Sequence, residues 1–123
     1  MQNEFHSAIA AGMEALNAVA GESVEYVRGG VSKTITAVYS PREYAAAVEL
    51  NALLSYQSDD FLIVRADLDL GDGPTEPQRG DLIRRNDGER VEVYAVQNVP
   101  GQNCFRKSGP LRWRIHAKLM ETT

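Results

Sequence analysis

Residues 23–39 read SVEYVRGGVSKTITAVY, and this stretch decides the fold class. Polar and apolar side chains alternate before Gly29-Gly30, and β-branched residues crowd the run that follows. Two such runs joined by Gly-Gly predict a β-hairpin, because glycine reaches a positive φ angle without steric cost. Two more alternating runs, 81–85 and 90–96, flank Asn86-Asp87-Gly88 and predict a second hairpin.

Further strands are predicted outside these hairpins. Residues 61–64 form a short apolar run typical of a buried strand, and residues 112–119 alternate charged and apolar side chains along one last strand. Residues 42–56 have the composition of a helix but lie between predicted strands, so their own sequence leaves both structures open. Residues 71–77 hold two glycines and two prolines, which exclude regular structure there.

The N-terminal segment has a different period. Phe5, Ile9, Met13 and Leu16 recur at spacings of four, four and three, which predicts a helix over residues 1–21 that ends at Gly21. The whole pattern predicts a mainly β fold, a small antiparallel β-barrel or sandwich of about six or seven strands with one N-terminal α-helix. At 123 residues we expect a single domain, with the β unit over 22–123.

Composition and charge exclude several classes of protein. The chain is 43% hydrophobic and 24% charged, which is typical of soluble globular domains. Its longest aliphatic or aromatic run has four residues, 61–64, whereas a membrane span needs roughly 20. We therefore expect no membrane contact, and no secretory signal is recognised at the N-terminus. The net charge of −4 is uneven: residues 59–81 hold seven acidic and two basic side chains, whereas 82–118 hold eight basic and three acidic ones.

No motif predicts catalysis, a metal site or a cofactor. One cysteine, Cys104, and two histidines, His6 and His116, are too few for a typical zinc site, and we expect His116 at a surface or interface. The acidic run 67–72 does not match the spacing of a calcium loop. Residues 71–76 lack the Gly-Lys-Ser/Thr of a phosphate-binding loop. We therefore expect no enzyme activity and no cofactor.

One basic cluster contains an aromatic residue and leaves a second function open. The cluster consists of Arg106, Lys107, Arg112, Trp113 and Arg114. Such a group can contact phosphates and stack a base, so a nucleic-acid-binding β-barrel is the alternative function. The sequence pI of about 5.1 argues against it, because free-standing nucleic-acid binders are usually basic. Trp113 is expected in the core or an interface instead.

Several stretches taken together resemble one family. PQRGDLI at 77–83, VEVY at 91–94 within 88–96, and LRWRIHAK at 111–118 follow the Gly29-Gly30 hairpin and the runs 59–63 and 66–68. In this order and spacing they resemble the head–tail joining proteins of tailed bacteriophages and prophages, also called head-completion or neck proteins. The resemblance covers about residues 22–119.

The resemblance implies a small β-barrel without catalysis or cofactor, with residues 42–56 extended. It implies a virion structural protein, made in the cytoplasm of the host bacterium and placed at the head–tail junction. Such proteins assemble as a ring at the portal vertex of a DNA-filled capsid and form the platform for the tail. The expected partners are therefore other copies of the chain and the portal or connector, neck and tail proteins, with DNA passing through the ring without sequence-specific binding.

Two long loops, 70–78 and 97–110, are the predicted partner-binding surfaces, because long loops in compact domains tend to carry function. In a ring, the acidic 59–81 surface of one subunit would face the basic 84–118 surface of the next. Acidic groups lining the channel would repel DNA phosphates. The candidate interface residues are Asp72, Glu76, Arg79, Asp81, Arg106, Lys107, Arg112, Trp113 and Arg114.

Overall fold

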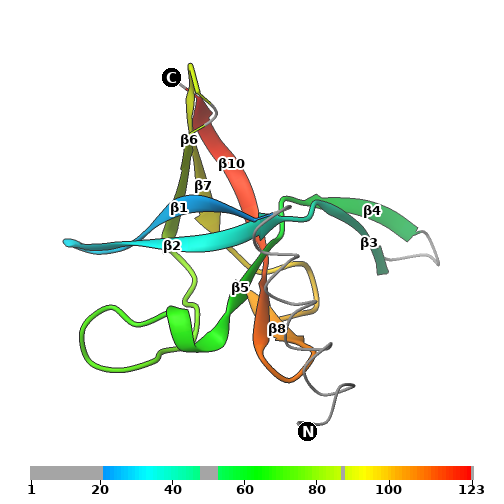
Figure 1. Cartoon of the computed structure of the whole chain (residues 1–123). Coiled ribbons are helices and arrows are strands. Elements are labelled where there is room, and N and C mark those ends of the chain that lie inside the picture. The colour runs from blue at the N-terminus through cyan, green and yellow to red at the C-terminus, as the bar shows by residue number, and fades with distance from the viewer. Residues whose placement is uncertain (1–20, 48–52, 87, 123) are drawn as a thin grey trace, which may run out of the picture.

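The computed structural model describes residues 21–47, 53–86 and 88–122 (Figure 1). This part of the chain is mainly β and has no α-helix; one 3₁₀ turn, η2, spans Arg65–Asp67. The strands are β1 Gly21–Arg28, β2 Val31–Tyr39, β3 Arg42–Ala47, β4 Leu53–Ser58, β5 Phe61–Val64, β6 Leu82–Asn86, β7 Val91–Val96, β8 Phe105–Ser108, β9 Arg112–Ile115 and β10 Ala117–Thr122. The described part of the chain therefore has ten strands, more than the expected six or seven.

Both predicted hairpins are confirmed. β1 pairs antiparallel with β2 across the Gly-Gly turn, where Gly29 has a φ of 60°. β6 pairs with β7 across the second turn, and Gly88 there has a φ of 83°. The side chain of Asn86 accepts a hydrogen bond from the backbone N–H of Gly88 at 3.0 Å, which tightens this turn.

The main sheet has eight strands in the order β10-β7-β6-β1-β2-β5-β9-β8, and it curls into a half-barrel. The predicted single strand over 112–119 is wrong, because His116 divides it into β9 and β10, which belong to different parts of the sheet. The backbone N–H of His116 donates to the carbonyl of Cys104, and its carbonyl accepts from Gln97. The stretch 112–122 thus links β5 and β8 on one side with β7 on the other.

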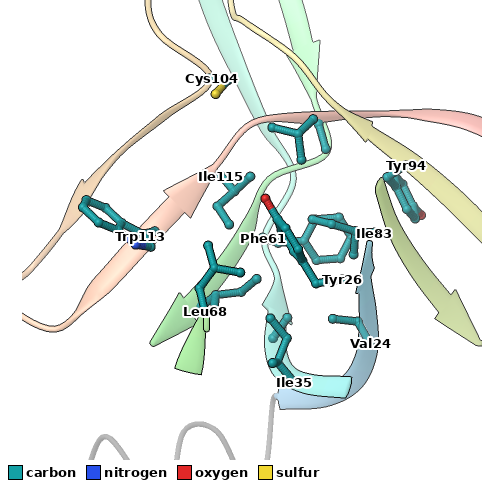
Figure 2. Packing of buried hydrophobic residues seen from close by; sticks show 14 residues of the cluster. Val24, Tyr26, Ile35, Phe61, Leu68, Ile83, Tyr94, Cys104, Trp113 and Ile115 are labelled. Atoms are coloured by element: carbon teal, nitrogen blue, oxygen red, sulfur yellow. The ribbon is translucent and has the colours of Figure 1, made fainter. Parts of the chain in front are cut away.

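Alternation along the strands fills the curled sheet with apolar side chains (Figure 2). Tyr26, Phe61, Ile63, Ile83 and Ile115 are fully buried, and Leu68 reaches the core from the end of the 3₁₀ turn. The predicted buried strand at 61–64 is confirmed, since Phe61 and Ile63 on β5 are both fully buried. β8, by contrast, lies inside the stretch 97–110 that was expected to be a loop.

β3 and β4 form a separate two-stranded sheet that projects sideways from the half-barrel (Figure 1). We call residues 42–58 the arm. The extended conformation implied by the resemblance is confirmed for 42–47 and 53–56, where strand pairing overrides the helical composition. Residues 48–52 lie outside the described part. So does the predicted N-terminal helix, apart from Gly21, which begins β1.

Candidate partner interface

A buried polar cluster fastens the base of the arm to the main sheet. Asp60 is 0% exposed. Its carboxylate accepts hydrogen bonds from Ser58 Oγ at 2.6 Å, from Arg114 Nη1 at 2.9 Å and from the hydroxyl of Tyr44, and His116 Nδ1 lies 3.0 Å away. Burial alone would raise the pKa of Asp60, but bonds from His116, Ser58, Tyr44 and Arg114 outweigh it and lower the pKa to about 2. The charged carboxylate therefore joins β3, β4 and β9.

This cluster overturns one expectation about the last strand. His116 is buried and does not lie on a surface; its ring meets that of Tyr44 edge-on, with centroids 5.2 Å apart. Arg114 is buried as well, and it also donates to the carbonyl and hydroxyl oxygens of Ser40. Alternation predicts Arg114 on the outer face of β9, but no local pattern indicates that Asp60 and Ser40 cover that face.

A second polar cluster fixes the long loop between β5 and β6. The carboxylate of Asp81 is buried and accepts from Tyr26, from Arg28 Nε at 3.0 Å and from the backbone N–H of Gln78 at 2.9 Å. Arg28 also donates to Thr75 Oγ1 at 3.2 Å and to the carbonyl of Glu76 at 2.8 Å. The loop is therefore held in one shape without regular structure. Burial, together with the hydrogen bond to Asp81, raises the pKa of Tyr26.

The long loop and the turn after β8 together line a groove of about 440 Å³. We call it the loop groove; among its lining residues are Arg65, Pro74, Glu76, Pro110, Leu111 and Trp113. The backbone N–H of Arg65 donates to the carbonyl of Leu111 at 2.8 Å, which joins the two walls. The Arg65 guanidinium lies 4.5 Å from the centre of the Trp113 ring, so the groove has apolar walls and carries both signs of charge.

The nine predicted interface residues differ in how far their side chains are exposed to solvent. Asp72, Glu76, Arg79, Arg106 and Lys107 are exposed, and Arg112 is half-buried. The other three lie inside the subunit: Asp81 and Arg114 in the two polar clusters, and Trp113, only 5% exposed, against the ring of Phe105. The structure brings Glu76 and Trp113 together in the loop groove but places Arg106 over the ring of Tyr44, on the arm.

Sequence reasoning missed Arg65 and Leu111, which lie together at the loop groove. Leu111 follows the Gly109-Pro110 turn and is 52% exposed, one of four large apolar side chains exposed in the described part of the chain. A leucine directly after a Gly-Pro turn is the one signal that could have drawn attention to it. Nothing in the local sequence marks Arg65.

A family model described as phage head-tail joining protein matches residues 2–123. The chain belongs to this family. Membership confirms the resemblance seen in the sequence and makes this head–tail joining protein a structural component of the phage neck, located in the virion. A search of curated proteins finds no match. Within the described part of the joining protein, no helix is long and apolar enough to cross a membrane.

Proposed function

We propose that this joining protein is a non-enzymatic neck subunit that assembles into a ring and connects the portal or connector side of the DNA-filled capsid to the tail. The family match over residues 2–123 carries this proposal. We assign the joining role to residues 22–123. Residues 1–20, which lie outside the described part, are proposed as a segment attached to this unit.

The proposed partner surfaces are the exposed parts of the two long loops. Asp72 and Glu76 lie on the first loop and Arg79 directly follows it, whereas Arg106 and Lys107 lie on β8 within the second. Because the Arg28–Asp81 contacts already fix the first loop, little conformational entropy is lost when it binds. A partner with opposite charges would be recognised on these side chains.

The channel of the ring is proposed to pass DNA without binding its sequence. Asp67 and Asp72 are exposed on the long loop, and acidic side chains facing a channel would repel phosphates. The alternative function, nucleic-acid binding through 112–114, loses support because Trp113 is only 5% exposed and Arg114 is paired with Asp60 at 2.9 Å. Neither side chain is available as a stacking or phosphate-binding group.

Electron microscopy of lysates from a phage that lacks this gene tests the proposal. We expect filled heads and separate finished tails to accumulate, and purified protein added to the lysate to join them. Tailed particles at normal yield in the deletion lysate would overturn the joining role.

A charge-reversal variant tests the basic part of the proposed surface. Arg106→Glu combined with Lys107→Glu should lower the yield of joined particles at least about tenfold, because both side chains are exposed at the free edge of β8. Arg90→Glu is the control for charge reversal, since Arg90 is exposed between β6 and β7, outside both loops. Circular dichroism should be unchanged in both variants. Normal joining by the double variant would exclude this part of β8 from the interface.

A further inference from the structure

Four large apolar side chains are exposed on the described part of the molecule: Val31, Leu111, Leu119 and Met120. Leu111, 52% exposed, lies in the loop groove, whereas Leu119 and Met120, 46% and 57% exposed, adjoin on β10. In Figure 1 the end of β10 is at the top of the view, whereas the 3₁₀ turn and β8, which flank the groove, are near the bottom. The groove and the end of β10 both leave apolar side chains free to pack against another chain.

β10 carries a bulge at Met120, close to the end of the strand. β10 is the outer strand beside β7, and the register of this pair shifts between Leu119 and Glu121. This bulge takes Met120 out of the ladder, which re-aims its side chain. Asp59 Oδ2 accepts from the backbone N–H of Leu119 at 3.1 Å and fixes the strand just before the bulge.

The loop groove complements this strand end in polarity and charge. Its walls offer Leu111, Pro74 and the ring of Trp113, which suit an unbranched, adaptable side chain such as methionine. Arg65 at the groove and Glu121 beside Met120 form no ion pair with any other residue in the described ranges. The positive charge of Arg65 at the groove thus complements the negative charge of Glu121, which lies next to Leu119 and Met120.

We propose that the end of β10 of one copy docks into the loop groove of a second copy. Met120 packs against Leu111 and Pro74 of the neighbour, and Glu121 meets its Arg65. Because the two surfaces lie at different ends of the subunit, the contact is head-to-tail and closes into a ring once the rotation between subunits completes a circle. The inference rests on the proposed ring assembly and names the surfaces that form it.

Disulfide cross-linking in joined particles tests the contact. The variant Leu111→Cys with Met120→Cys, oxidised with diamide in purified tailed particles, should give a ladder of dimers and larger species on a non-reducing gel. The native Cys104 is only 3% exposed and should not compete. Each single-cysteine variant should stay monomeric. The matched control, Thr34→Cys with Met120→Cys, should give no ladder, because Thr34 is exposed on β2 and lines a different hollow, beside Glu25 and Arg84.

The outcomes separate this inference from the proposed function. Joined particles without a ladder overturn the docking contact and leave the joining role intact, whereas unaltered tailed particles in the deletion lysate overturn the joining role itself. Cross-linking by Met120→Cys alone would show that two β10 ends meet symmetrically, and it would also overturn the proposal.

A charge swap provides a second test that needs no cysteine. Arg65→Glu and Glu121→Arg should each lower the yield of joined particles at least about tenfold, as loss of an interface anchor does, and the double variant should recover most of it. Equal loss in the singles and the double would contradict a direct contact between these two side chains.

Discussion

Replacing Asp60 with asparagine would show how strongly the buried cluster holds the arm to the sheet. The two side chains have nearly the same size, so the change removes the charge and little volume. The Arg114 side chain, 8% exposed and 2.9 Å from the carboxylate, would then keep a buried positive charge without its partner. An uncompensated buried charge is costly because water cannot solvate it.

The magnitude follows from the pKa of Asp60. Hydrogen bonds lower this pKa from 3.8 to about 2, and each unit corresponds to about 1.4 kcal/mol, so the charge stabilises the fold by about 2 kcal/mol. The unpaired Arg114 adds to this loss, and breaking a buried ion pair typically costs about 3–5 kcal/mol. We expect Asp60→Asn to lower the free energy of unfolding by about 3 kcal/mol at neutral pH.

Urea unfolding followed by the fluorescence of Trp113, the single tryptophan, measures this change. With a urea dependence of about 1–3 kcal/mol per molar, the midpoint should fall by about 1–3 M. In an Arg114→Met background, the cost of Asp60→Asn should shrink to under about 1 kcal/mol, because the unpaired charge is gone. A midpoint shift below about 0.3 M in the otherwise native protein would refute the reasoning.

Acid unfolding measures the contribution of the buried Asp60 cluster to stability in a second way. Because the folded pKa of Asp60 lies below the unfolded value of 3.8, its stabilisation is complete above about pH 4 and is lost as the pH falls towards about 2. The native protein should lose about 2 kcal/mol over this range from this one group. Asp60→Asn should lack that part of the loss, and identical acid profiles for the two proteins would contradict the assignment.

Three more predictions concern other buried groups. Asp81→Asn should lower the free energy of unfolding by about 2 kcal/mol, because it weakens the hydrogen bonds from Arg28. The loop between β5 and β6 then opens more often, so trypsin should cleave faster at the exposed Arg79. An unchanged cleavage rate, followed by mass spectrometry, would contradict this. Burial raises the pKa of Tyr26 and of Tyr39, so the folded protein keeps protons that the unfolded chain loses, and urea titrations should show stability falling above about pH 10. Burial also raises the pKa of the Cys104 thiol, so a thiol reagent should label it only as the protein unfolds; labelling within the mixing time would argue against the buried position.

Local patterns predicted the parts of the fold that depend on neighbouring residues. The two hairpins rest on alternation and on Gly29-Gly30 and Asn86-Asp87-Gly88, all of which act over a few positions. The division of 112–119 into two strands could not be predicted in this way, because it depends on the carbonyl of Cys104 and the N–H of Gln97, which come from elsewhere in the chain.

The candidate site was harder to predict because its decisive contacts are long-range. Asp60 and His116 are separated by 56 positions, and Arg28 and Asp81 by 53. Charge alone selected Asp81 and Arg114 as interface residues, although such side chains are also the ones that pair when buried. The resemblance identified the family and the extended arm, but it did not indicate which charges face solvent.

The passage of the chain from β9 through His116 into β10 affects how the protein is made. Two pairings can form only after residues 112–122 have left the ribosome. These are β5 with β9, where Phe61 lies opposite Ile115, and β7 with β10. Until then the nascent chain consists of hairpins with open edges, which favour aggregation and recruit chaperones. A translation product that stops before residue 112 therefore lacks β9 and β10 and the buried side chains of Trp113, Ile115 and Ala117, so its core stays incomplete.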